Sequence, residues 1–137
     1  MVCELCSGES FLKFSYFRHF AEDEANGNPY NFSFTVRVSS DGFRGHTVWE
    51  CDRKEFVKFV QSLKNLYDFH DTSAELTDLG YGSRIRFEMD KTGHITVTGT
   101  LYGHAADHSV TFRFTADQSD LYTFLINLYK QKFPFTD

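Results

Sequence analysis

The chain has 137 residues, of which 41% are hydrophobic and 24% are charged, and its formal net charge is -5. This composition is typical of one folded globular domain over residues 1–137 and excludes disorder over most of the chain. No apolar run approaches the roughly 18 residues of a membrane-spanning helix. The acidic balance argues against nucleic acid as a partner, because phosphate binding needs clustered lysine and arginine.

The N-terminal segment indicates a cytoplasmic protein. No basic stretch followed by an apolar one is visible there, so no secretory signal is expected. Three cysteines, an odd number, agree with a reducing compartment. Cys3 and Cys6 have the C-x-x-C spacing of redox pairs and zinc half-sites, but the sequence offers neither a helix start nor two further ligands. We expect inert thiols there, within a loosely ordered segment 1–9.

The first part of the chain is dominated by strand patterns. Residues 10–20 are rich in aromatic side chains, and Leu12, Phe14 and Tyr16 share one parity, which predicts a strand with these three on one face. The charged segment 22–29 contains Asn, Gly and Pro and predicts a loop. Alternating apolar and polar residues around a Ser-Asp-Gly turn then predict an antiparallel hairpin, with strands over 30–39 and 43–50.

Two later segments have the apolar spacing of amphipathic helices. Asp52 and Glu55 have capping-box spacing before the first helix, and Asp117 precedes the second, which Pro134 ends. An offset of 65 residues places Asp52 on Asp117 and superposes the two helices, although any two capped helices after a strand align in this way. Four strands are expected between the helices, near 74–79, 83–90, 94–101 and 108–115.

These elements predict an α+β fold with the order β-β-β-α-β-β-β-β-α. The strands would form one antiparallel sheet of six or seven strands, with the two amphipathic helices packed on one face. The core would be strongly aromatic, because the chain contains 16 Phe.

The best metal candidate is a short run of histidines with an acid. His104, Asp107 and His108 place two imidazoles and a carboxylate within five residues. The run reads as a loop that leads into a strand, and no Glu follows His104 to act as a base, so we expect titrating surface histidines there. The sequence shows no nucleotide-binding fingerprint, nucleophile motif or acid–base pair. We therefore expect no catalytic residue, cofactor or metal.

The distribution of acidic residues points to a basic protein partner. Two stretches, 67–83 and 21–36, contain acids and no base, and such stretches steer and dock basic surfaces. A simple solubilising surface explains them equally well. The candidate partner-binding residues are Asp68, Asp71, Glu75, Asp78, Glu22, Asp23 and Glu24.

Several short strings resemble the WapI-like immunity proteins, over about residues 31–130. They are turns, core positions and helix caps, namely Gly42-Phe43-Arg44-Gly45, Glu55-Phe56 to Leu66-Tyr67, Ala74-Glu75-Leu76, Gly93-His94-Ile95 with Val97 and Gly99, Val110-Thr111-Phe112-Arg113-Phe114, and Asp117-Gln118 before Leu121. Proteins of this family are small, cytoplasmic and bacterial, and are encoded beside contact-dependent polymorphic toxins. The resemblance implies no catalytic residue and no cofactor.

Two functional hypotheses follow. The first is a binding protein that neutralises a cognate toxin domain, with acidic surfaces that mimic phosphate in the basic cleft of a nuclease. The second is a small-molecule-binding domain or enzyme with a pocket between sheet and helices, lined by the aromatic core.

Overall fold

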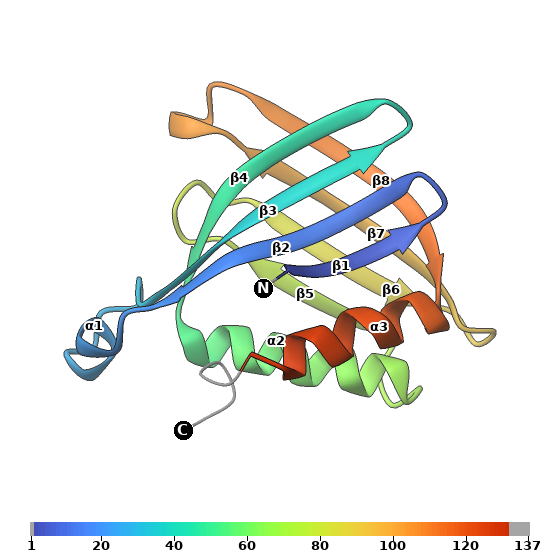
Figure 1. The fold of residues 1–137 in the computed structure, drawn as a ribbon, viewed down its shortest axis with the longest axis horizontal. Helices are drawn as coiled ribbons and strands as arrows, with labels where there is room; N and C mark the ends of the chain where they lie inside the picture. The colour runs from blue at the N-terminus through green and yellow to red at the C-terminus, as the bar shows by residue number, and fades with distance from the viewer. Residues whose placement is uncertain (1, 132–137) are drawn as a thin grey trace.

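The computed structural model describes residues 2–131 (Figure 1). The elements in chain order are β1 (Val2–Ser7), β2 (Ser10–His19), α1 (Ala21–Ala25), β3 (Phe32–Ser40), β4 (Phe43–Cys51), α2 (Arg53–Tyr67), β5 (Ser73–Thr77), β6 (Arg84–Met89), β7 (His94–Tyr102), η1 (His104–Ala106), β8 (Ser109–Asp117) and α3 (Gln118–Tyr129). Within the described residues no helix combines the length and the apolar character needed to cross a bilayer.

The strands form two sheets, so the prediction of one sheet with six or seven strands is wrong in this respect. The first sheet has the order β1-β2-β3-β4 and the second the order β5-β6-β7-β8, both fully antiparallel. The α+β class is confirmed. Periodicity identifies strands but carries no information about which strand edges pair, so it does not show where one sheet ends and the next begins.

The two halves of the chain have the same long elements in the same order. Four strands precede α2, and four more precede α3. The structure therefore supports the repeat that the 65-residue offset suggested. Each long helix packs against the first strand of the other half, α3 against β1 and α2 against β5, and the helices also contact each other (Figure 1). Each helix thus lies against one edge strand, α3 against β1 and α2 against β5, which protects these two edges from pairing with other chains.

Strand β1 was not predicted, because residues 1–9 were expected to be loosely ordered. Its register with β2 runs from Val2 opposite Ser15 to Ser7 opposite Ser10. Cys3 and Leu5 point into the core and are fully buried. The strand is short and has only these two buried side chains, so its alternation was too weak a signal. The predicted loop 22–29 likewise contains the short helix α1.

Tyr16 does not share a face with Leu12 and Phe14. A bulge between Ser15 and Arg18 interrupts the pairing of β2 with β3, and Tyr16 there has a φ of 56°. An extra residue shifts the alternation of the strand. Tyr16 is consequently 74% exposed, while Phe17 turns inward and stacks on Phe34 at 5.5 Å between ring centroids.

The core between sheets and helices is aromatic, as predicted. Phe14 lies 4.8 Å from Phe34 and 5.3 Å from Phe124, measured between ring centroids. Phe56 of α2 lies 5.1 Å from Phe34. Phe59 and Phe124, which occupy equivalent positions in the two helices, are both buried. Rings from both halves therefore fill one continuous core.

The remaining predicted elements are present with small shifts at their ends. The hairpin of β3 and β4 closes through Asp41 and Gly42, which have φ values of 51° and 80°, a pair of left-handed residues typical of two-residue hairpin turns. Helix α2 begins after Asp52, whose side chain accepts a hydrogen bond from the Lys54 amide. Helix α3 ends at Tyr129, and Pro134 lies outside the described residues.

Candidate functional site

The seven predicted acidic residues lie in separate regions of the surface. Glu22, Asp23 and Glu24 belong to α1, which contacts the first turn of α2 through Glu24 and Arg53. Asp68 and Asp71 follow the opposite end of α2, a helix of 15 residues and therefore about 22 Å in length. Figure 1 shows α1 and the end of α2 at opposite sides of the molecule. The fold does not gather the acids into one patch.

Asp78 is a structural residue rather than a surface charge. It is 2% exposed. Its carboxylate accepts hydrogen bonds from the amides of Glu50 at 2.8 Å, Gly80 at 3.1 Å and Tyr81 at 2.8 Å. These bonds fix the turn after β5 and join it to β4. A carboxylate used in this way is not available to a partner.

Basic neighbours lie beside two more of the acids. The register of β5 with β6 places Arg86 opposite Glu75, and the Glu75 carboxylate lies 3.2 Å from Arg86 and 3.5 Å from Arg84. Asp68 accepts a hydrogen bond from Lys64, one turn earlier on α2. The stretch 67–83 is free of bases in sequence, but the strand pairing and the helix turn bring bases to it.

Glu24 holds α1 against α2. The Arg53 side chain, which is 4% exposed, donates to both carboxylate oxygens, from Nε at 2.8 Å and from Nη2 at 3.0 Å. His19 lies 2.7 Å from the same carboxylate. The hydrogen bonds from Arg53 and His19 lower the pKa of Glu24 to about 2. Of the predicted acids, Glu22, Asp23 and Asp71 have no ion pair within the described residues, and Glu22 and Asp71 are exposed.

The histidine run does not form a cluster of ligands. His104 accepts or donates a hydrogen bond at Nδ1, 2.9 Å from the Tyr81 hydroxyl, and its ring packs edge-on against the Tyr81 ring. Between residues 2 and 131, no three His, Cys, Asp or Glu side chains converge as metal ligands would.

The cysteines are separated by the alternation of β1. Cys3 points into the core and Cys6 to the surface, so the two thiols of the C-x-x-C spacing lie on opposite faces of the strand. Burial raises the pKa of Cys3 to about 11 and also raises that of Cys51. Thiols with raised pKa values are poor nucleophiles and metal ligands at neutral pH.

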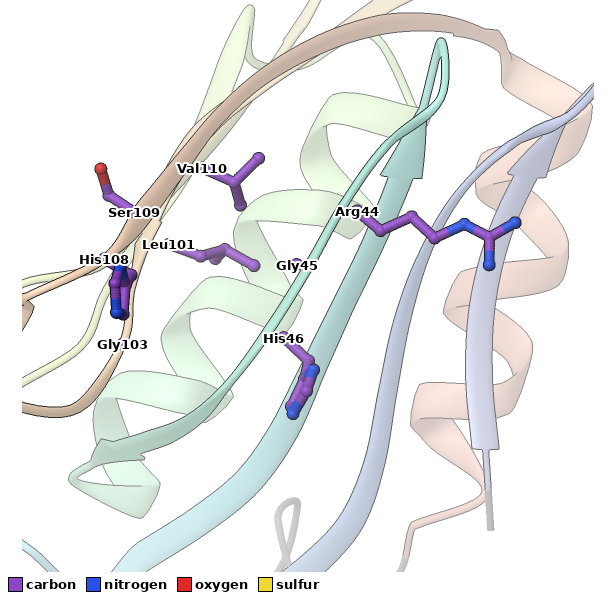
Figure 2. A pocket seen from close by; sticks show the side chains of 8 residues that line it. All are labelled: Arg44, Gly45, His46, Leu101, Gly103, His108, Ser109 and Val110. Atoms are coloured by element: carbon purple, nitrogen blue, oxygen red, sulfur yellow. The ribbon is translucent and has the colours of Figure 1, made fainter.

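A hollow lies between the edge strands β4 and β8, where the two sheets meet (Figure 2). Its volume is about 140 Å³. Gly45 permits this approach, because a Cβ at that position would lie 2.4 Å from a methyl group of Val110. Figure 2 shows Arg44 extending away from His46 and His108, so the three nitrogen-bearing side chains do not converge on one ligand.

Sequence reasoning missed a row of basic residues on the outer face of the first sheet. The registers place Lys13, Arg37 and His46 opposite one another on β2, β3 and β4, at the polar positions of each strand. The three residues are far apart in sequence, so the sequence alone does not show that they are neighbours. Combining the parity of each strand with the hairpin register would have predicted their alignment.

Comparisons with known proteins complete these observations. The sequence profile of the immunity protein WapI-like family matches residues 7–134, nearly the whole chain. No curated protein sequence matches significantly. Among solved structures, one described as "Crystal structures of trypanosoma bruciei MRP1/MRP2" has a similar fold, with a TM-score of 0.54 and 7% sequence identity over 95% of this chain and 81% of that one.

Proposed function

Because the chain belongs to the WapI-like immunity protein family, we propose that it neutralises a cognate bacterial toxin domain by direct protein–protein contact in the cytoplasm. The match over residues 7–134 carries this proposal, since it covers both halves of the fold. The resemblance noted from the sequence is thereby confirmed. A binding role also agrees with a surface on which charged side chains are spread over sheets, turns and helix ends rather than converging at one centre.

Acidic contacts with the toxin are part of the proposal. They are assigned to Glu22, Asp23 and Asp71, which keep their charge free of ion pairs within the described residues. Glu75 and Asp68 are each paired with a base, and their attraction for a basic partner is reduced by that base. Glu24 and Asp78 act inside the fold.

The alternative hypothesis, a small-molecule site or an enzyme, requires an apolar pocket between sheet and helices. The rings predicted to line it, such as Phe14, Phe34 and Phe56, are at most 1% exposed and contact one another. Five of the hollows on the described part of the chain are lined by other residues. These observations favour the binding role.

This function can be tested in a bacterial host. The toxin domain that is encoded beside the gene of this chain is expressed there alone and together with the chain. We expect growth to stop with the toxin alone and to continue when the chain is expressed with it. A toxin from an unrelated system serves as the control and should remain lethal. Growth arrest that the chain does not relieve, at matched and verified expression levels, would contradict the proposal.

A further inference from the structure

The outer face of the first sheet carries Lys13, Arg37 and Arg44 close together. Cross-strand pairing places Glu4, Lys13, Arg37 and His46 in one line from β1 to β4, and Arg44 follows two residues along on the same face of β4. Glu4 lies at the end of the line and only 3.8 Å from Lys13. Arg37 and Arg44 are exposed and make no ion pair within residues 2–131. Their charge is therefore available to a partner.

The second sheet has fewer unpaired cations on its outer face. It carries Arg84, Arg86 and Arg113 there, and acids lie beside the first two, since Glu75 is 3.5 Å from Arg84 and 3.2 Å from Arg86 and Glu88 is 2.9 Å from Arg86. In a chain with a net charge of -5, free cations collected on one sheet face produce a strongly polarised surface. Such a surface attracts and orients an oppositely charged partner.

Exposed apolar side chains lie beside the cations. The next row of the sheet runs from Val2 through Ser15 and Thr35 to Val48, and Val48 is 58% exposed. Tyr16 follows Ser15 and is 74% exposed at the bulge. Tyrosine and arginine are the side chains most enriched at the energetic centres of protein interfaces.

The backbone at Tyr16 supports a role for this ring outside the fold. A φ of 56° is unfavourable for any residue with a Cβ. Strained residues that persist in a structure gather at functional sites, and so do bulges that redirect a side chain. No ring contact, hydrogen bond or ion pair holds Tyr16 against the rest of the described chain.

We propose that the toxin domain docks on this outer face through an acidic surface with an apolar centre. The cationic face is defined by Lys13, Arg37, Arg44, Tyr16 and Val48. The inference rests on the proposed function and names the surface that performs it. Strands β2, β3 and β4 are about 30 Å long and β1 about 20 Å, so at a spacing of about 4.8 Å they present on the order of 500 Å². This is much of the roughly 800 Å² that one partner contributes to a stable interface.

The chemistry of this face favours a protein over a nucleic acid. A polyanion needs many cations in contact with successive phosphates, and the remaining surface of this acidic chain would repel it. Val2, Val48 and an isolated tyrosine suit an apolar protein surface bordered by carboxylates. The acidic contacts of α1 and of the α2 end lie off this face and would be independent of it.

The double variant Arg37→Glu with Arg44→Glu tests the electrostatic part. With the neighbouring toxin domain as the probe, we expect affinity to fall at least 100-fold, largely through slower association, and rising salt to lessen the loss. The matched control is Arg84→Glu with Arg113→Glu, which changes the net charge equally at two exposed arginines on the outer face of the second sheet. The control should bind within about threefold of the wild type.

A second variant, Tyr16→Gly, separates binding from folding. Glycine accepts the left-handed backbone, so thermal stability should be maintained or increased. Loss of the exposed ring should nevertheless weaken toxin binding at least tenfold. Loss of stability together with affinity would show that the ring serves the fold and would overturn its assignment to the interface.

The outcomes distinguish this inference from the proposed function. If wild-type chain binds the toxin and both variants bind equally well, the cationic face is not the interface, although the immunity role stands. If wild-type chain does not bind the toxin at all, the proposed function fails. Binding of a 20-nucleotide single-stranded RNA that depends on Arg37 and Arg44, without such dependence for the toxin, would overturn the choice of a protein partner.

Discussion

Glu24 of α1 and Arg53 of α2 are joined by two parallel hydrogen bonds, of 2.8 and 3.0 Å, across the boundary between a surface segment and the core. The Arg53 amide also donates to Asn31 at 2.7 Å. The segment between β2 and β3 is therefore fastened to the first turn of α2. Glu24 belongs to an acidic stretch of the sequence, but in the structure it holds α1 against α2.

This pair predicts a specific dependence of stability on pH. The pKa of Glu24 is about 2 in the fold and 4.5 ordinarily, so between these values the unfolded chain binds more protons. The stabilisation is complete above pH 4.5 and is lost as the pH falls towards 2. Glu24→Gln should cost about 1–3 kcal/mol at pH 7. Urea unfolding at several pH values should show wild type and variant converging near pH 2, and a constant difference would contradict the assignment.

Asp78 and Asp71 belong to the same acidic stretch but should respond differently to substitution. Asp78→Ala removes the acceptor of three backbone amides and should lower the free energy of unfolding by about 1–3 kcal/mol. Asp71→Ala should change it by less than about 0.5 kcal/mol, because Asp71 is exposed. Chemical denaturation of the two variants tests this difference. Equal effects on the free energy of unfolding would show that Asp78 is a surface acid like Asp71.

The sequence predicts well those features that depend on local patterns. Asp52 and Asp117 identify both long helices, and the alternation of β3 and β4 with their turn identifies the hairpin. The 65-residue offset also suggested the two equivalent halves. These features depend on caps, turns and periodicity within about ten residues, which one sequence displays directly.

Features that depend on pairing between distant segments were missed. The strands divide into two sheets, and α2 packs against β5 of the second sheet while α3 packs against β1 of the first. Contacts between such distant segments leave no local pattern in the sequence. The bulge at Tyr16 changes which side chains of β2 point into the core, although the sequence alternates regularly up to that point. Arg84 and Arg86 lie beside Glu75 only because β5 pairs with β6. An acidic run in sequence is thus a poor guide to an acidic surface when strands bring bases beside it.

The core can be tested through its two equivalent phenylalanines. Phe124 is completely buried, and Phe124→Ala removes its transfer free energy and leaves a cavity, which together cost about 3–5 kcal/mol. Phe59→Ala should lie in the same range. Lys58→Ala, on the exposed side of α2, should cost less than about 0.5 kcal/mol. Chemical denaturation with equally mild effects for all three would show that the helix faces are assigned wrongly.

Zinc should leave the protein unchanged. His104 is engaged with Tyr81, and binding of a metal to the folded state would raise stability by mass action. We expect the same melting temperature with added zinc and with chelator. A melting temperature that rises when zinc is added, and that no longer rises in the variant His108→Ala, would establish a metal site at this loop.

Isothermal titration calorimetry of the purified chain with the purified neighbouring toxin domain tests the central claim most directly. Neutralisation by direct contact predicts a one-to-one complex with a Kd well below about 1 μM. The double variant Arg37→Glu with Arg44→Glu should lose most of that affinity, and Arg84→Glu with Arg113→Glu should keep it. No complex at about 10 μM of both proteins, or toxin inactivated by far less than an equimolar amount of the chain, would contradict it.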